Sequence, residues 1–116
     1  MTHVIEKTRV YTPESLGVKG GEAHISLIRV LQIIEDEFKD RLHELEARRG
    51  KRLKITDVEL QNQMTASALE PLVVRSYVYR RDKKGNFEVR VFVHSQRKNT
   101  ESRIAKATYM LGAAEV

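Results

Sequence analysis

The residue types that could carry chemistry show no spacing typical of a catalytic or metal site. The four histidines are scattered along the 116-residue chain, and Asp40 with His43 forms only one half of a helical carboxylate–histidine pair. Cysteine is absent, which excludes thiolate zinc sites, iron–sulfur clusters and cysteine nucleophiles. No serine lies in a nucleophile elbow. We therefore expect a protein that is not an enzyme and that uses neither a metal nor a cofactor.

Positive charge is concentrated in the C-terminal part of the chain. The whole sequence carries a formal net charge of +5. Residues 71–116 hold 10 Lys+Arg against 4 Asp+Glu, a net of +6, whereas residues 1–70 carry a net of −1. A basic segment of this kind favours an anionic partner, of which nucleic acid is the commonest.

Two runs within this basic part predict an antiparallel β-hairpin. Residues 72–80 are rich in β-branched and aromatic side chains, residues 86–95 alternate between apolar and polar, and residues 82–85 have the composition of a turn. With Lys84 and Gly85 as the turn pair, the predicted cross-strand pairs are Tyr77–Phe92, Tyr79–Arg90, Arg75–His94 and Arg81–Glu88. All eight side chains then share one face, and the valines point to the other.

This face predicts the function. Aromatic rings among guanidinium groups suit single-stranded nucleic acid, because bases stack on the rings while the cations neutralise phosphates. We predict a non-catalytic nucleic-acid-binding protein, without distinguishing DNA from RNA, whose contact residues are Arg75, Tyr77, Tyr79, Arg81, Lys83, Lys84, Arg90, Phe92, Arg97, Lys98, Arg103 and Lys106. The alternative that strand propensity alone explains the rings, with the face covered or merely solvated, stays open.

Three helices are expected to position the hairpin. Apolar residues recur at spacings of three and four over residues 22–49, Glu/Lys and Glu/Arg pairs flank them, and Gly50 is a natural C-terminal cap. Thr56 and Glu59 have the spacing of a capping box, which predicts a second helix over 57–69 that ends before Pro71. A last, basic helix is expected over 99–112.

The long helix also suggests assembly. Phe38, Leu42 and Leu45 extend beyond what the shorter second helix can cover, so another copy of the chain can pack on them. The alternative function is therefore a structural subunit of a viral particle or larger complex, oligomerising through the long helix and an N-terminal arm. The absence of a signal peptide and of a long apolar run places the protein in the cytoplasm, or in a virion assembled there.

The predicted fold is α+β, with a long central helix, a shorter antiparallel helix, the hairpin, the N-terminal segment as a candidate third strand, and the C-terminal basic helix. Residues 1–21 form a strand or arm with a Gly-rich loop, and residues 22–116 form a single domain. A winged helix is a second interpretation of the same elements, although Pro71 would fall inside its recognition helix. In the order of hairpin and basic helix, the C-terminal third also resembles the end of a double-stranded-RNA-binding domain, and no residue role is carried over from it.

Overall fold

A computed structural model describes residues 2–16, 24–67 and 69–114 of the chain. Its elements, in chain order, are β1 (Thr2–Tyr11), β2 (His24–Ile25), α1 (Leu27–Arg49), β3 (Leu53–Asn62), β4 (Ala66–Ser67), β5 (Leu72–Arg80), β6 (Phe87–Arg97) and β7 (Thr100–Ala113). The described residues thus contain one helix and a set of mostly long strands. The predicted Gly-rich loop at residues 17–21 lies outside the described residues.

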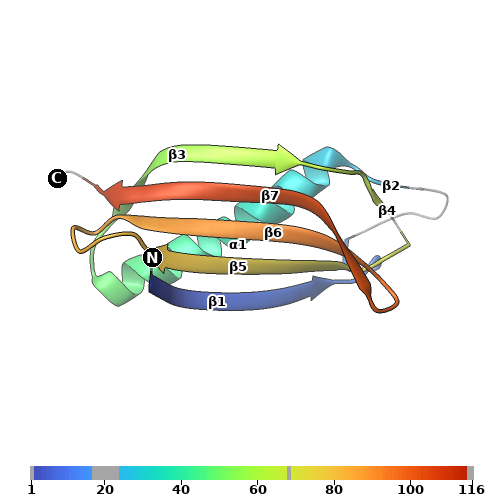
Figure 1. The fold of residues 1–116 in the computed structure, drawn as a ribbon, viewed down its shortest axis with the longest axis horizontal. Coiled ribbons are helices and arrows are strands. Elements are labelled where there is room, and N and C mark those ends of the chain that lie inside the picture. The colour runs from blue at the N-terminus through green and yellow to red at the C-terminus, as the bar shows by residue number, and fades with distance from the viewer. Residues whose placement is uncertain (1, 17–23, 68, 115–116) are drawn as a thin grey trace.

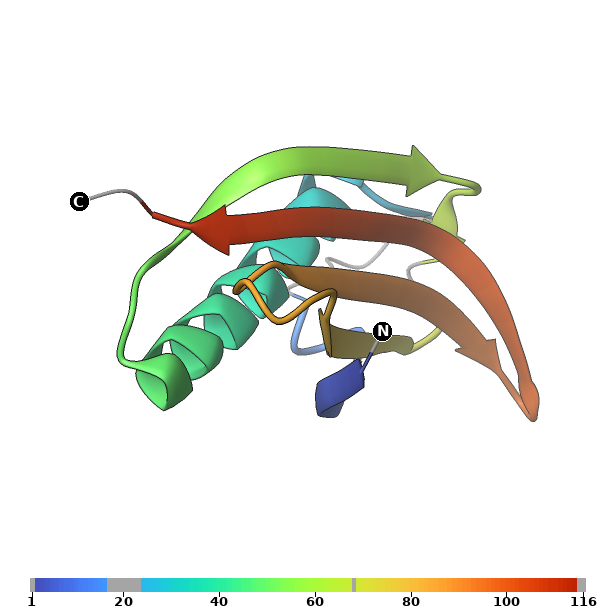
Figure 2. The ribbon, with the colours of Figure 1, turned by 60° about the vertical axis from the view of Figure 1, so that its left-hand side comes forward.

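The five long strands of the described chain form one antiparallel sheet in the order β1-β5-β6-β7-β3, and β2 pairs separately with β4. β1 and β3 are therefore the two edge strands, and the N-terminal strand pairs with β5 along its length. The sheet lies over α1 and curves around it, so the helix occupies the concave side (Figures 1 and 2). The convex side, which we call the outer face, points away from the helix.

Alternation along the strands builds the core between α1 and the sheet. Every second side chain of β6 points to the helix, and Val89, Val91 and Val93 are fully buried there. On β7, Ala105 and Ala107 are also buried. Ala107 lies in the same pocket lining as Ile34 and Phe38 of the helix, which are both buried.

The predicted long helix is present, and its ends have identifiable causes. Ser26 caps the N-terminus, because its hydroxyl accepts a hydrogen bond from the Arg29 amide (3.2 Å). Gly50 adopts a left-handed conformation (φ 66°) and donates its N–H to the Glu46 carbonyl, as the sequence predicts for a C-terminal cap.

The predicted second helix over 57–69 is wrong, because this segment is strand β3 followed by β4. The capping-box spacing of Thr56 and Glu59 has no structural counterpart: the Thr56 hydroxyl instead donates to the Met110 carbonyl of β7 (3.2 Å). The irregularity in the β3–β7 register between Ile55 and Asp57 is the physical reason for the error. An extra residue at this point moves the apolar side chains from odd to even positions, which hides a two-residue period.

The predicted C-terminal helix over 99–112 is also wrong, because the segment forms β7, paired on both sides with β6 and β3. Its alanines and charged residues favour helix locally, and the pairing on both edges overrides that preference. The predicted arrangement of three helices is therefore replaced by a sheet that covers a single described helix.

The hairpin is present, with a register shifted by two residues from the predicted one. Arg75 pairs with Phe92 and Tyr77 pairs with Arg90. The turn is longer than predicted: the Arg81 amide donates to the Asn86 carbonyl (2.9 Å), and Asp82 accepts from the Lys84 amide inside it (2.8 Å). A shift of two residues preserves the faces, so the predicted division between rings and valines is confirmed.

Within the described residues, no helix is long and apolar enough to cross a membrane.

Candidate active site

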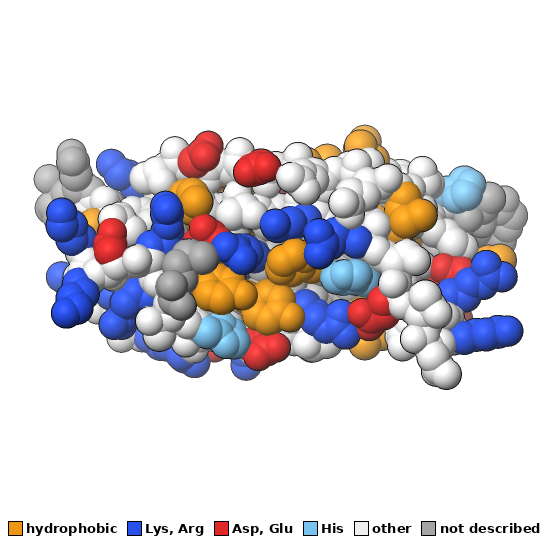
Figure 3. All heavy atoms as spheres, in the orientation of Figure 1, with side chains coloured by type: hydrophobic (Ala, Val, Ile, Leu, Met, Phe, Trp, Pro, Cys, Tyr) orange, Lys and Arg blue, Asp and Glu red, His pale blue; other side chains and the backbone are white. Residues whose placement is uncertain are grey.

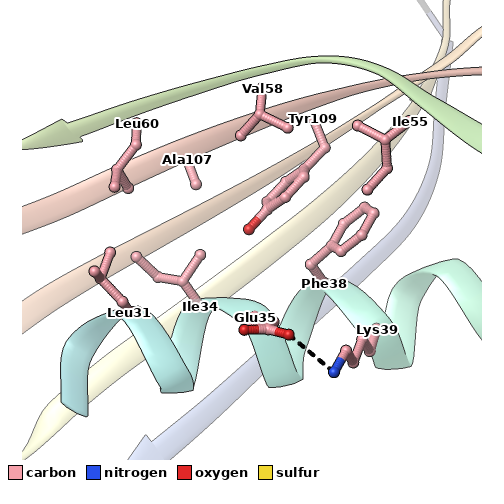
Figure 4. A pocket seen from close by; sticks show the side chains of 10 residues that line it. All are labelled: Leu31, Ile34, Glu35, Phe38, Lys39, Ile55, Val58, Leu60, Ala107 and Tyr109. Atoms are coloured by element: carbon pink, nitrogen blue, oxygen red, sulfur yellow. Dashed lines mark ion pairs between the residues drawn. The ribbon is translucent and has the colours of Figure 1, made fainter. Parts of the chain in front are cut away.

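An apolar pocket opens between α1 and the β3 edge of the sheet. It has a volume of about 350 Å³. Helix residues form one wall and strand residues of β3 and β7 form the other (Figure 4). The apolar lining consists of Leu31, Ile34, Phe38, Ile55, Val58, Leu60, Ala107 and Tyr109.

The strand wall is apolar because the β3 side chains that line the pocket are all aliphatic. Ile55, Val58 and Leu60 point down from the strand toward the helix (Figure 4). They are about half exposed, at 47%, 50% and 46%, because β3 is an edge strand with nothing packed beyond it in the described chain. The pocket therefore opens at this edge of the molecule.

An aromatic pair forms one end of the pocket. The rings of Phe38 and Tyr109 are stacked, with their centroids 3.8 Å apart and their planes at 11°. The Tyr109 hydroxyl projects into the pocket (Figure 4). Burial, together with the negative charge of Glu35, raises the pKa of Tyr109 above its ordinary value of 10.0, so the hydroxyl keeps its proton at neutral pH.

An ion pair stands at the mouth of the pocket. Lys39 Nζ lies 2.9 Å from Glu35 Oε1, one helical turn away, and both side chains are more than half exposed. The hydrogen bond to Glu35 raises the pKa of Lys39. The pocket thus combines an apolar interior with a carboxylate and a hydroxyl donor at its boundary, an arrangement able to hold an apolar group and to activate water beside it.

A second charged cluster, on the β1 side of α1, ties the helix to the sheet. The buried Glu37 carboxylate accepts a hydrogen bond from the Tyr11 hydroxyl (3.0 Å) and pairs with Arg9 Nε (3.1 Å). Next to it, the buried Arg41 donates to the Ser76 hydroxyl (3.4 Å). Glu37 thus has two partners on β1, and Arg41 Nε forms an ion pair with Glu44 Oε2 at 3.3 Å, so we assign these groups a structural role.

The outer face carries the predicted contact surface. Arg75, Tyr77, Tyr79, Phe92, His94 and Arg103 line a shallow groove of about 470 Å³, which we call the outer groove. In Figure 3, hydrophobic side chains gather near the middle of this face, with basic side chains around them. The outer groove lies on the opposite side of the sheet from the apolar pocket.

Only part of the predicted contact set comes together at the outer groove. Two of the predicted residues flank the groove: Arg90 lies over the Tyr79 ring, and Lys106 lies over the Phe92 ring. Arg81 reaches Met110 on β7. Lys83 and Lys84 lie in the β5–β6 turn, whereas Arg97 and Lys98 lie at the opposite end of β6.

The residues predicted for oligomerisation lie beneath the sheet of the same chain. Phe38 is 4% exposed and Leu45 is 1% exposed, while Leu42 is partly buried against the core. No second copy is needed to cover this part of the helix.

Sequence reasoning missed the apolar pocket. Glu35 and Lys39 were visible in the sequence, but only as a pair that supports the helix. The sequence pattern predicts helices for the segments that contain Tyr109 and the β3 side chains, and helices at these positions do not bring them opposite α1. The apolar residues 53, 55, 58 and 60 were the available signal, and the irregularity near Thr56 obscured it.

Among the described residues, no group of three or more His, Asp or Glu side chains is placed to hold a metal ion.

Comparison with known proteins identifies the architecture. No protein-family model matches the sequence, and no curated protein matches it. Among solved structures, 4-hydroxybenzoyl-CoA thioesterase from Pseudomonas sp. strain CBS-3 is similar, with a TM-score of 0.64 and 12% identity over 96% of this chain and 86% of that chain. A hot-dog-like protein from Thermanaerovibrio acidaminovorans gives 0.62 and 12% over 95% and 81%. A hexameric acyl-CoA thioesterase in its apo form gives 0.64 and 15% over 96% and 69%.

These similarities overturn the predicted function. The fold is one found in enzymes that cleave CoA thioesters, so the prediction of a non-catalytic protein is wrong, as is that of a nucleic-acid partner. The alternative of a structural subunit of a virion or complex is likewise unsupported, since no similar structure reported above is of that kind. What the comparisons establish for this chain is its architecture: a hot-dog fold, in which a curved antiparallel sheet wraps a central helix.

Proposed function

We propose that this chain is a thioesterase, which hydrolyses an acyl thioester and holds the acyl group in the apolar pocket between α1 and β3. The observation that carries the proposal is the pocket itself, an aliphatic and aromatic slot of about 350 Å³ with the Glu35 carboxylate at its mouth. The fold supports the proposal, because similar structures include a 4-hydroxybenzoyl-CoA thioesterase and an acyl-CoA thioesterase. The cytoplasm remains the proposed location.

Glu35 is the proposed general base. Its carboxylate takes a proton from a water molecule, the water oxygen attacks the thioester carbonyl carbon, the carbon–sulfur bond breaks, and the thiolate leaves and takes up a proton. Lys39 holds the carboxylate in place through their 2.9 Å ion pair. The Tyr109 hydroxyl, which projects into the pocket and keeps its proton, is a donor for the acyl end of the substrate.

The net charge of +5 supports an anionic thioester carrier such as CoA. A positive protein raises the local concentration of a polyanionic substrate through long-range attraction, an effect that weakens as salt is added. We therefore expect the apparent KM for a CoA ester to rise with ionic strength.

The site is incomplete in one chain, and we propose that a second copy completes it. Glu35 is 59% exposed, and a general base works best where bulk water is excluded. Beside it, Val58 and Leu60 are half exposed on a free strand edge, which is able to pair with another strand. A second copy docked along β3 would cover these side chains and close the mouth of the pocket.

The activity test is a thiol-release assay with benzoyl-CoA and hexanoyl-CoA. General acid–base catalysis contributes typically about 10²- to 10⁴-fold, so Glu35→Gln is expected to lower kcat by about 100-fold or more. Asp36→Asn is the matched control, because it removes the same charge from a neighbouring carboxylate that is exposed and does not line the pocket. No hydrolysis of either ester by the wild-type protein, or full activity in Glu35→Gln, would refute the proposal.

The assembly test is a mass measurement by light scattering. Val58→Lys is expected to shift the protein to monomer, because a charge then lies in the interface. Gln61→Lys is the control, since it adds the same charge to β3 at an exposed position outside the pocket lining. A wild-type protein that stays monomeric at all concentrations would contradict this part of the proposal.

A further inference from the structure

The outer groove is a second concavity, which the proposed thioesterase reaction does not use. Its volume of about 470 Å³ lies within the usual range for small-ligand sites. It is separated from the apolar pocket by the sheet, because successive residues of a strand point to opposite faces. Lys106, for example, points to the outer face, and the next residue, Ala107, lines the apolar pocket.

Aromatic rings form the floor of the outer groove. Tyr77 meets Phe92 edge to face at a centroid distance of 5.7 Å, and it lies 6.1 Å from the ring of Tyr79. These rings are only partly exposed, because they support one another laterally. A planar aromatic ligand can extend such a cluster, since offset and edge-to-face arrangements of rings are both favourable.

Two cations beside the floor have no carboxylate partner among the described residues. The Arg103 guanidinium lies 5.1 Å from the Phe92 ring centroid, and Lys106 Nζ lies 5.5 Å from it. Two other arginines on this face are already neutralised: Arg75 makes a bidentate pair with Glu101, at 2.7 and 2.8 Å, and Arg90 pairs with Glu88. Among the residues that line or flank the outer groove, the unmatched positive charge therefore lies beside Phe92.

We infer that the outer groove binds a small aromatic carboxylate, with its ring against Tyr77 and Phe92 and its carboxylate between Arg103 and Lys106. A charge-assisted contact to two cations supplies orientation, and the ring cluster supplies contact area. A second copy of the chain is a poorer occupant, since two identical faces would bring the same unpaired cations together. The inference goes beyond the proposed function, because neither Glu35 nor the apolar pocket takes part in it.

The test is a titration of the ¹⁵N-labelled protein followed by NMR, with sodium benzoate as the probe. We expect amide shifts centred on Phe92 and Lys106. Cyclohexanecarboxylate has the charge without the aromatic ring, and benzamide has the ring without the charge, so each is expected to bind about tenfold more weakly than benzoate. Equal binding of all three compounds would overturn the inference.

Two double variants distinguish specific binding in the outer groove from a general attraction of anions to the basic protein. Arg103→Gln with Lys106→Gln is expected to weaken benzoate binding about tenfold. Lys83→Gln with Lys84→Gln removes the same charge at the β5–β6 turn, away from the groove lining, and is expected to change it little. The amide spectrum of each variant shows whether it is folded.

The outcomes are separable from those of the thioesterase assay. Shifts at Phe92 with an inactive protein would keep this inference and refute the proposed function. Shifts confined to the apolar pocket, at Phe38 and Ala107, would overturn the inference and leave the proposed function standing. Equal weakening by both double variants would also overturn it.

Discussion

The stacked pair at the end of the apolar pocket gives the sharpest test of the packing. Phe38 is 4% exposed and its ring lies 3.8 Å from that of Tyr109. Replacing a buried Phe by Ala costs roughly 3 to 5 kcal/mol. Because Phe38 borders a pocket open to solvent, water can occupy part of the vacated space, so we expect about 3 kcal/mol, the lower end of that range.

That loss corresponds to a large shift in melting temperature. An unfolding entropy of about 2.1 cal/mol/K per residue gives roughly 0.24 kcal/mol/K for a chain of this length, so Phe38→Ala is expected to melt about 12 °C lower. Urea unfolding followed by far-UV circular dichroism measures the free energy directly. All variants are compared at one protein concentration, because assembly would make stability depend on it.

Phe38→Leu separates the ring from the apolar volume. Leucine keeps most of the buried carbon and loses the stack, which is worth about 0.5 to 1.5 kcal/mol beyond area burial, so its expected cost is about 1 kcal/mol. A loss below 1 kcal/mol for Phe38→Ala, or an equal loss for both variants, would show that the ring does not pack as described.

Three further predictions concern the helix end and the outer face. Gly50→Ala is expected to cost about 1 kcal/mol in urea unfolding and Gly50→Asn less, because φ is +66° there and asparagine tolerates that conformation better than alanine. Burial, and the charges of Arg75 and Arg103, hold the pKa of His94 below its ordinary 6.5 despite the opposing charge of Glu101, so its NMR titration midpoint should lie below 6.5. Hydrogen bonds from Arg75 lower the pKa of Glu101 from its ordinary 4.5, so its contribution to stability is present above about pH 4.5 and is lost as the pH falls through the lowered folded value. The free energy of unfolding, measured between pH 3 and 6, should therefore change less with pH in Glu101→Gln than in the wild-type protein. The expected difference is below about 1 kcal/mol, as for other partly exposed ion pairs.

The elements that could be predicted from sequence are those whose pattern is local and regular. The long helix shows apolar residues at spacings of three and four and has a glycine in the left-handed conformation after it. The second strand of the hairpin has an apolar residue at every second position from Phe87 to Val93. The two faces follow from odd and even positions alone, so an error of two residues in register leaves them unchanged. Local pattern was sufficient for these elements.

The pocket could not be predicted, because it depends on strands whose pattern is interrupted. In β3, Leu53 and Ile55 precede the irregularity, and Val58 and Leu60 follow it, so their common direction is visible only once the pairing with β7 is known. In β7, small and charged residues resemble a helix, although Ala107 is a buried residue that lines the apolar pocket. When β3 and β7 are predicted as helices, the predicted sheet lacks these two strands. The wall of the pocket opposite α1 is then missing as well.

Strand alternation gives the two faces of this sheet their separate chemistry. In β7, Lys106 points to the outer face, and Ala107 points to the apolar pocket, so adjacent residues belong to different proposed sites. A slip of one residue in the β6–β7 pairing would exchange them, placing a lysine against α1. The irregularity near Thr56 acts in the same way on the pairing of β3 with β7, because Ile55 before it and Val58 after it point to the helix side only when the extra residue is accommodated there. The interruption that conceals β3 from sequence analysis is thus the feature that brings Ile55, Val58 and Leu60 into one wall of the apolar pocket.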